Sequence, residues 1–354
     1  MIKSIYKIIG VMSGTSLDGI DLVYASFKCS ETWKFQIHLA ETIPYNDQWK
    51  SILSSLTLRS IEELYQIDRD YTDYLASVIR YFISKYNVID IDAICSHGHT
   101  ALHQPEKTLT YQIGNLPLLA TLVNNRVVCD FRIQDVKLGG QGAPFVPIGD
   151  RLLFSEYVFC INLGGFANIS TEVGNKRIAY DICPVNIVLN HYVKNLGLDY
   201  DNEGQIASIG NLNYDLLEQL NTLSYYNILP PKSLGLEWVN RHVFPIINSF
   251  NLEVKDILRT FVEHIAVQIS KSVLEIPNGS VLVTGGGAYN TFLIERLKQL
   301  TDNKIVIPSK EIIEYKEALI FGFLGVLKLR DEINCLKSVT GASKNHSSGK
   351  VFIP

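Results

Sequence analysis

Two stretches of this 354-residue chain begin in the same way, and this repetition constrains the fold more than any other feature. In residues 5–27, an apolar strand pattern runs into the turn Met12 to Ser16 (MSGTS), and apolar alternation then resumes. In residues 157–170, a second strand pattern runs into Gly164 and Gly165 and then into another strand-like stretch. A strand, a glycine turn and a second strand therefore occur twice, which predicts a duplicated fold.

The segments between these starts alternate between helical and strand patterns. Apolar residues recur with a helical period in residues 61–86, in 257–269 and in the very apolar segment 317–329. Short buried-strand patterns occur at 91–95, 127–129 and 281–283, and residues 290–300 read as a further helix. This order predicts an α/β protein, and the hairpin-like starts favour a mixed sheet over a purely parallel one.

Composition narrows the classes of protein that the chain can belong to. A length of 354 residues favours two domains, and 47% hydrophobic with 19% charged residues is typical of a globular protein with a large core. The formal net charge of −4 argues against nucleic acid as the main partner, because such proteins usually present a basic face. The longest apolar run, residues 318–327, is about half of the roughly 20 residues that a membrane span requires.

The cysteines and the N-terminus indicate the compartment. The six cysteines are scattered without a C-x-x-C pair, and most lie in apolar strand-like runs, as expected of small core residues in a reducing environment. The N-terminal segment lacks the apolar region and cleavage site of a signal peptide. We therefore expect a cytoplasmic protein that does not bind membranes.

Three glycine turns, each following a buried-strand pattern, are candidate ligand sites. In the first, Gly14 and Gly19 allow close backbone approach, and amides with the Thr15 and Ser16 hydroxyls suit phosphate oxygens. The second contains Gly164 and Gly165. The third, residues 284–290 (TGGGAYN), lies between a strand and a helix N-terminus and is not a P-loop, because the Lys and Ser/Thr are missing. The alternatives are that the first turn is a hairpin turn with additional polar side chains and that the other two are ordinary turns, without a bound ligand.

Two further features could carry chemistry. Asp181 ends a strand-like run in the second half and could be a general base, although many such Asp residues only cap helices or form turns. His97, His99 and His103 could bind zinc, but no fourth ligand is evident nearby. Contacts with a substrate and structural hydrogen bonds are the alternatives for these histidines.

The motifs taken together resemble one known family. Residues 10–21 (GVMSGTSLDGID) resemble the opening signature of anhydro-N-acetylmuramic acid kinase. Further similarity covers nearly the whole chain, in residues 96–100 (SHGHT), 130–135 (DFRIQD), 139–144 (GGQGAP), 162–168 (NLGGFAN), 285–290 (GGGAYN), Glu317-Ala318 and 339–342 (VTGA).

The resemblance implies a fold and an activity. The family belongs to the sugar kinase, Hsc70 and actin superfamily, which implies two ribonuclease-H-like lobes with ATP in a central cleft. We expect lobes at residues 1–135 and 136–354, with the helix near 317–329 packing between them. The implied reaction converts 1,6-anhydro-N-acetylmuramic acid, ATP and water into N-acetylmuramic acid 6-phosphate, with Mg²⁺ bridging phosphates, in peptidoglycan recycling. The resemblance also implies a homodimer.

Site residues follow by matching the motifs residue by residue. Asp181 matches the catalytic Asp and would deprotonate the attacking water. Arg132, Gln141, Glu317 and His97 lie in motifs that would face the sugar. The ATP-binding residues would be Gly14, Thr15, Ser16, Leu17, Asp18, Gly19, Ile20, Asp21, Gly164, Gly165, Gly286, Gly287 and Asn290. The ligands of the metal are not implied, because Met12 stands where many superfamily members carry an Asp.

Some residues depart from the family pattern and leave two other functions open. The usual F-D-T-G-P-G-N is here residues 180–186 (YDICPVN), so Ile182 and Val185 replace Thr and Gly beside the base, Cys183 replaces the other Gly, and His99 replaces Gln in S-H-G-Q-T. A related sugar kinase acting on an ordinary hydroxyl, or an ATP-binding sensor without activity, would also fit. A DNA-binding regulator is disfavoured because no helix-turn-helix pattern precedes residue 5.

Overall fold

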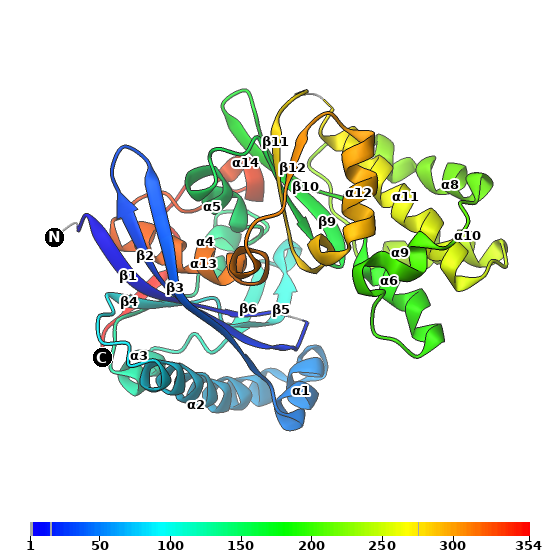
Figure 1. The fold of residues 1–354 in the computed structure, drawn as a ribbon. Coiled ribbons are helices and arrows are strands. Elements are labelled where there is room, and N and C mark those ends of the chain that lie inside the picture. Colours follow the sequence, from blue (N-terminus) through cyan, green and yellow to red (C-terminus); the bar gives the residue numbers. More distant parts are fainter. Residues whose placement is uncertain (1–2, 15, 275) are drawn as a thin grey trace. The chain divides into compact units, whose positions relative to one another are not determined.

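The computed structural model describes residues 3–14, 16–274 and 276–354 (Figure 1). The chain forms two compact units, one of Met1–Leu153 with Tyr315–Pro354 and the other of Phe154–Glu314. The elements of the first unit are β1 (Ile5–Ser13), β2 (Gly19–Cys29), β3 (Trp33–Pro44), α1 (Asp47–Ser54), α2 (Ile61–Lys85), β4 (Ala93–Ser96), β5 (His99–Gln104), β6 (Leu109–Ile113), α3 (Leu118–Val123), β7 (Val127–Cys129), α4 (Arg132–Lys137), α5 (Val146–Leu153), α14 (Lys337–Thr340) and β13 (Lys350–Phe352).

The second unit contains most of the remaining elements. These are β8 (Phe159–Leu163), β9 (Phe166–Val173), β10 (Lys176–Pro184), α6 (Asn186–Val193), α7 (Gln205–Ser208), α8 (Tyr214–Asn221), α9 (Leu236–His242), α10 (Phe244–Ser249), α11 (Val254–Ser272), β11 (Ser280–Thr284), α12 (Thr291–Leu300) and β12 (Lys304–Val306). The helix α13 (Lys310–Leu329) begins in the second unit and continues into the first.

The two main sheets have the same core topology. In the first unit the strand order is β13-β7-β4-β1-β2-β3, in which β1, β2 and β3 are antiparallel neighbours and β4 and β7 run parallel to β1. In the second unit the order is β10-β9-β8-β11-β12 with the same directions. Numbering the five core strands of each unit in chain order gives 3-2-1-4-5 twice. The prediction of a mixed α/β fold with two ribonuclease-H-like halves is therefore confirmed.

Alternation along β1 explains how the first sheet is covered on both faces. Ile9 and Val11 belong to the core that includes the buried face of α2. The intervening Gly10 faces α13, where a Cβ atom at this position would lie 2.1 Å from the Ala318 carbonyl oxygen. Because neighbouring strand residues point to opposite faces, one strand serves both helices. Figure 1 shows α2 running along one side of this sheet.

The helix α2 confirms its sequence prediction almost to the residue. Ser60 accepts a hydrogen bond from the Glu63 N–H, and the Glu63 side chain accepts one from the Ser60 N–H, which is a capping box at the start of the helix. Its apolar stripe is buried at Leu64, Tyr71 and Leu75. The second unit is built in the same way, with the apolar face of α11 buried against β8, β9 and α12.

The division into units differs from the predicted boundary at residues 135–136. The first unit continues to Leu153, and it also contains the segment from Tyr315, which we had assigned to the second lobe. The reason is packing: Gly10 and Gly325 allow α13 to approach the first sheet closely, and β13 pairs with β7 at its edge. None of the helices in the described part of the chain is both long and apolar enough to cross a membrane.

Candidate active site

The first glycine turn joins β1 to β2. The Leu17 N–H donates to the Gly14 carbonyl at 3.4 Å, and Leu17 has a φ of 62°, a left-handed conformation that costs a bulky residue free energy. Strained backbone of this kind is often retained at functional sites. Ser16 and Asp18 are exposed. The predicted contact at Thr15 lies outside the described residues.

The residues that follow this turn belong to the fold itself. Ile20 is fully buried in the core of the first unit, and Asp21 Oδ1 accepts a hydrogen bond from Thr42 Oγ1 at 2.6 Å. A Cβ atom on Gly19 would lie 2.5 Å from the Ile43 carbonyl oxygen, so strand pairing alone requires glycine there. Gly14 differs, because the nearest atom to its Cβ position would be Ser16 Oγ at 3.5 Å. Of these residues, Gly14 is the one with space for a ligand.

A buried hydroxyl cluster supports the end of β1 below this turn. Ser13 Oγ lies 2.6 Å from the Tyr45 hydroxyl and 2.7 Å from His99 Nδ1, and it accepts a hydrogen bond from the Tyr71 hydroxyl at 2.9 Å. Burial lowers the pKa of His99 to about 4, so its imidazole is neutral near pH 7. His99 therefore has a structural role in the layer that carries the turn.

The three histidines considered as zinc ligands each have a different partner. His97 Nδ1 lies 2.9 Å from the Gly98 carbonyl, His99 Nδ1 contacts Ser13, and His103 Nδ1 lies 3.1 Å from Thr110 Oγ1. The H-x-H run does not form a metal-ligand cluster in the described part of the chain.

The second glycine turn lies between β8 and β9 at the start of α6. The N–H of Val185 donates to the Gly165 carbonyl at 2.8 Å, and the N–H of Asn186 donates to the Gly164 carbonyl at 3.3 Å. Cβ atoms on Gly164 and Gly165 would meet nothing closer than 3.4 Å and 3.8 Å, respectively. Close packing within the protein therefore does not require glycine at either position, and the turn has room for a ligand.

The third glycine turn lies beside the second, because Thr284 of β11 is paired with Asn162 of β8. A Cβ atom on Gly287 would lie 2.7 Å from Leu163 Cβ, whereas one on the exposed Gly286 would be 3.9 Å from its nearest neighbour. Asn290 is the N-cap residue of α12, and its Oδ1 accepts the Leu293 N–H at 2.9 Å. Within this turn, Gly287 is required by packing and Gly286 is not.

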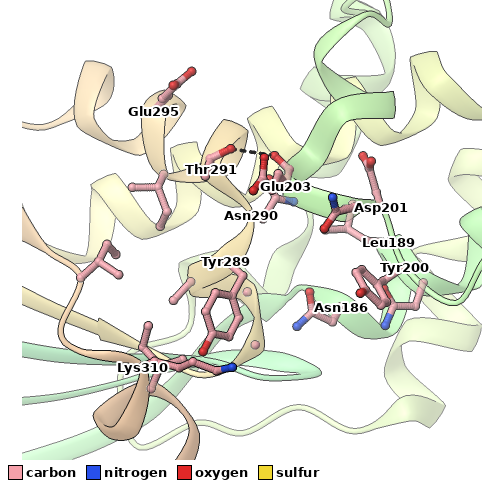
Figure 2. A pocket seen from close by; sticks show the side chains of 18 of the residues that line it. Asn186, Leu189, Tyr200, Asp201, Glu203, Tyr289, Asn290, Thr291, Glu295 and Lys310 are labelled. Carbon is pink, nitrogen blue, oxygen red and sulfur yellow. Dashed lines mark hydrogen bonds between the residues drawn. The ribbon is translucent and has the colours of Figure 1, made fainter.

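A pocket of about 900 Å³ opens beside this third turn (Figure 2). Gly286, Gly287 and Asn290 line it together with the two tyrosines Tyr200 and Tyr289. The Thr291 hydroxyl donates to the Glu203 carbonyl at 3.0 Å, which joins α12 to the loop that forms another part of the wall. The volume lies within the range of small-molecule and cofactor sites.

Some of the residues that line this pocket were not predicted from the sequence. Asn186 and Tyr200 line it from the segment around α6, and Lys310 lines it from the first turn of α13. Lys310 Nζ is 3.7 Å from Glu314 Oε1, which also accepts a hydrogen bond from the Tyr289 hydroxyl. No local motif links these residues, although Asn186 belongs to the motif that contains Asp181.

Asp181 lies on β10 at a register shift opposite β9. Its Oδ2 accepts the Leu234 N–H at 2.8 Å, and its backbone carbonyl accepts the Tyr225 hydroxyl at 2.6 Å. The side chain is half-buried, and Oδ1 has no hydrogen-bond partner among the described residues. Burial raises the pKa of Asp181, and the Leu234 N–H opposes that change. A carboxylate with a raised pKa, one fixed oxygen and one unengaged oxygen can act as a general base.

The loop opposite Asp181 carries a cation that the sequence did not reveal. The Asp181 N–H donates to the Lys232 carbonyl at 3.2 Å, and Lys232 Nζ lies 4.6 Å from the ring centre of Tyr225. Burial lowers the pKa of Lys232. The sequence motifs did not predict that Lys232 lies near Asp181, because about 50 positions separate the two residues.

The predicted sugar-binding residues all belong to the first unit, where the structure brings three of them together. Arg132 Nε donates to His97 Nε2 at 2.8 Å, and Arg132 Nη1 donates to the Gly142 carbonyl at 2.6 Å. Burial lowers the pKa of Arg132 to about 10, and the nearby Glu317 carboxylate opposes that change. The Gln141 side chain is exposed, while its backbone N–H donates to the Thr340 carbonyl at 2.8 Å.

His97 has a fixed role in this group. Burial lowers its pKa well below the usual value, so the ring is neutral. Because Nε2 accepts from Arg132, the proton lies on Nδ1, which faces the Gly98 carbonyl. His97 therefore orients the guanidinium of Arg132.

Comparison with known proteins agrees with this arrangement of motifs. The family model for anhydro-N-acetylmuramic acid kinase matches residues 6–354. A relative of that name from Sulfurovum sp. (strain NBC37-1) is 34% identical, covering 98% of this chain and 99% of its own. A second, from Vibrio cholerae, is 33% identical and covers 98% of each chain.

A solved structure, the activator of 2-hydroxyisocaproyl-CoA dehydratase from Clostridium difficile with bound ADPNP, is 14% identical with a TM-score of 0.45. It covers 92% of this chain and 97% of its own. That likeness is weak, and the assignment rests on the match of the family model and on the sequence relatives. The chain belongs to the anhydro-N-acetylmuramic acid kinase family.

Proposed function

We propose that this protein uses ATP and water to convert 1,6-anhydro-N-acetylmuramic acid into N-acetylmuramic acid 6-phosphate, a step of peptidoglycan recycling. The observation that carries the proposal is the environment of Asp181. Its carboxylate is half-buried and held by one backbone N–H, in the same unit as a nucleotide-sized pocket beside the third glycine turn. Family membership supplies the substrate class.

The first chemical step is the opening of the anhydro ring. Asp181 accepts a proton from water, and the water oxygen forms a bond to C1 of the sugar. The bond between C1 and the bridging oxygen breaks, and that oxygen remains on C6 as the nucleophile. The raised pKa of Asp181 makes it a stronger base than an exposed Asp, and the Leu234 N–H fixes the direction of its carboxylate.

The second step is phosphoryl transfer. The oxygen on C6 forms a bond to the γ-phosphorus of ATP, and ADP leaves. Such a transfer needs positioning and charge stabilisation more than covalent catalysis. Gly14, Gly164 and Gly165 have space at the Cβ position, so phosphate oxygens could approach the backbone there. The N–H groups of Gly14 and Gly165 would donate to these oxygens, because the Gly164 N–H already donates to the Phe166 carbonyl at 3.1 Å. The pocket beside Gly286 would receive the adenosine, with Tyr200 and Tyr289 offering aromatic faces to the base.

Mg²⁺ fits the chemistry of the first turn. The exposed Asp18 provides carboxylate oxygens, which this ion prefers. When bound, Mg²⁺ neutralises charge on the β- and γ-phosphates.

The first unit would bind the sugar. Arg132 is held by His97 on Nε and by the Gly142 carbonyl on Nη1, so its guanidinium is positioned before substrate arrives. Glu317 and Gln141 are exposed and offer hydrogen-bonding groups for sugar hydroxyls. His97 is a positioning residue here. A cytoplasmic location, a homodimer and the lack of a nucleic-acid partner stay predictions.

The experiment that tests this function offers the purified protein three substrates in parallel with MgATP. These are 1,6-anhydro-N-acetylmuramic acid, N-acetylmuramic acid and N-acetylglucosamine, with products identified by mass spectrometry. We expect a 6-phosphate from the anhydro sugar at a far higher kcat/KM than from either open sugar. Preference for an open sugar would identify an ordinary sugar kinase, and ATP binding without any phosphosugar would identify a sensor; either result would overturn the proposal.

A further inference from the structure

Three potential metal ligands meet inside the first unit, and none of them is among the site residues assigned above. They are Asp135 of α4 and, from the C-terminal segment, Cys335 and His346. One ligand atom from each residue lies within 4.8 Å of those of the other two. Their exposed fractions are 0%, 2% and 5%, so this group is not a solvated surface cluster.

The backbone fixes this group, which we call the DCH cluster. Cys335 and His346 form an isolated antiparallel β-bridge, with N–H···O distances of 3.1 and 3.2 Å. Directly paired residues of antiparallel strands place their side chains on the same side. The buried Asn334 holds the bridge in place, since its side chain donates to the Ser348 carbonyl and accepts the Ser348 N–H. The two side chains therefore reach Asp135 from one rigid segment.

The hydrogen bonds within the DCH cluster leave a nitrogen lone pair without a donor. His346 Nδ1 lies 3.2 Å from the Lys344 carbonyl oxygen, which requires the proton on Nδ1. In the neutral ring, Nε2 then carries a lone pair. This atom is buried without a hydrogen-bond partner and lies 3.6 Å from Asp135 Oδ1. A lone pair facing a carboxylate oxygen in the interior is unfavourable unless a positive charge lies close to both.

We propose that the DCH cluster binds a divalent transition-metal ion, with Zn²⁺ the best match, through Asp135 Oδ1, Cys335 Sγ and His346 Nε2. Cysteine sulfur, imidazole nitrogen and carboxylate oxygen are the three ligand types of protein zinc sites. Cys335 Sγ is 3.0 Å from Asp135 Oδ1, close enough for both atoms to bind one ion. On binding, the thiol loses its proton to solvent and the thiolate becomes the ligand.

The surroundings of the DCH cluster fit such a site. Metal-bound histidines usually donate their other N–H to a carbonyl or carboxylate, as His346 Nδ1 does to Lys344. The second oxygen of Asp135 accepts the Gly142 N–H at 2.8 Å, which orients its carboxylate. The Thr340 hydroxyl lies 2.7 Å from Asp135 Oδ1 and 3.8 Å from Cys335 Sγ, and so provides an oxygen for the fourth position.

The proposed ion would be structural. It would join the C-terminal segment to α4 and to the loop that contains Gly142, whose carbonyl holds Arg132. Its predicted effect is therefore on the stability of the first unit and not on the chemical step. The proposal does not depend on the function proposed above.

The test uses the full-length protein, with Zn²⁺ and Co²⁺ as probes. We expect about one zinc per chain by elemental analysis after purification with added Zn²⁺ and desalting. Replacement by Co²⁺ should give the strong near-ultraviolet absorption of a thiolate–cobalt bond and the visible bands of a four-coordinate site. Cys335→Ser should abolish the thiolate band, and His346→Gln should weaken binding at least 10-fold. The matched controls are Cys29→Ser and His38→Gln, which alter a cysteine and a histidine outside the cluster and should bind as the wild type does.

The competing explanation is a protonated His346 paired with Asp135 and no metal. In that case the wild-type protein would bind neither ion stoichiometrically, would show no thiolate–cobalt band, and would unfold at the same temperature with Zn²⁺ or with a chelator. Any of these results would overturn the proposal. The cobalt spectrum of the wild-type protein decides the question even if a variant does not fold.

Discussion

Asp181 and Asp135 are both carboxylates that lie in family motifs, but the fold treats them differently. Asp135 is completely buried, and its two oxygens accept hydrogen bonds from Gly142, Thr340 and Cys335. Asp181 is half-buried, and a single backbone N–H holds one of its oxygens. This difference indicates that a carboxylate in a family motif becomes a good catalytic candidate only when the packing of the protein leaves one of its oxygens without a hydrogen bond.

The glycines of the three turns also fall into two groups, those that packing requires and those with free space at the Cβ position. Gly19 and Gly287 are required by close contacts with β3 and β8, whereas Gly14, Gly165 and Gly286 have room for a Cβ atom. The sequence motifs contain both kinds without distinction. The following experiments test whether groups with free space carry function and fully packed groups carry stability.

The largest effect is expected from Asp181→Asn. We predict a loss of about 10³-fold or more in kcat, because the amide cannot accept the proton from water. The thermal midpoint should equal or exceed that of the wild type, because a raised pKa means that the charged carboxylate destabilises the fold at neutral pH. Steady-state kinetics and thermal unfolding of the same preparation check both statements, and near-normal turnover would contradict them. The control is Asp302→Asn, an exposed position of the same unit.

The next effect is on stability, at Asp135. Both carboxylate oxygens of Asp135 accept hydrogen bonds, whereas the amide in Asp135→Asn has only one acceptor oxygen. We therefore predict a loss of about 3 kcal/mol in the free energy of unfolding. Denaturant titration in buffer with a chelator measures the hydrogen-bond contribution apart from any metal. An unchanged midpoint would show that Asp135 is not the centre of a stabilising network.

A matched pair of neighbours in the third turn should show a smaller contrast. Gly287→Ala forces a Cβ atom to 2.7 Å from Leu163 and should cost about 1–3 kcal/mol of stability. Gly286→Ala should leave stability unchanged and raise the KM for ATP about 10-fold, because its methyl group extends into the pocket. Thermal unfolding and ATP kinetics of both variants provide the measurement. Equal loss of stability in the two variants would remove the distinction.

The smallest expected effect is a shift of the pH profile. A base must be unprotonated to act, so kcat/KM should fall as the pH decreases through the pKa of Asp181. Because burial raises that pKa, the acid limb should lie above the usual range of an aspartate. The residual activity of Asp181→Asn should lack this limb. A limb at the pKa of an exposed aspartate would argue that another group is the base.

Local sequence patterns were sufficient to predict much of the secondary structure. The apolar stripe in residues 61–86 predicted α2, and the strand pattern at 127–129 is β7 to the residue. Boundaries between the units were not predictable in this way. The C-terminal segment returns to the first sheet through β13, which pairs with β7. The spacing of apolar residues does not indicate with which distant strand a segment will pair.

The candidate site shows the same limit. Glycine turns are local and were found, whereas the loop of Lys232 and Leu234 beside Asp181 is distant in sequence and was not. The DCH cluster joins positions 200 residues apart, and no spacing rule could connect them. Whether a glycine serves packing or leaves space also depends on the neighbouring strand, as Gly286 and Gly287 demonstrate.

The central claim is that Asp181 activates the water that opens the anhydro ring. The most direct measurement runs the reaction in ¹⁸O-water and locates the label by mass spectrometry, with unlabelled product incubated in the same water as the control for exchange. The account predicts one ¹⁸O atom at C1 and none in the transferred phosphoryl group, with no label fixed by Asp181→Asn on the same time scale. Phosphorylated product without label at C1, or labelling at the wild-type rate in the variant, would contradict it.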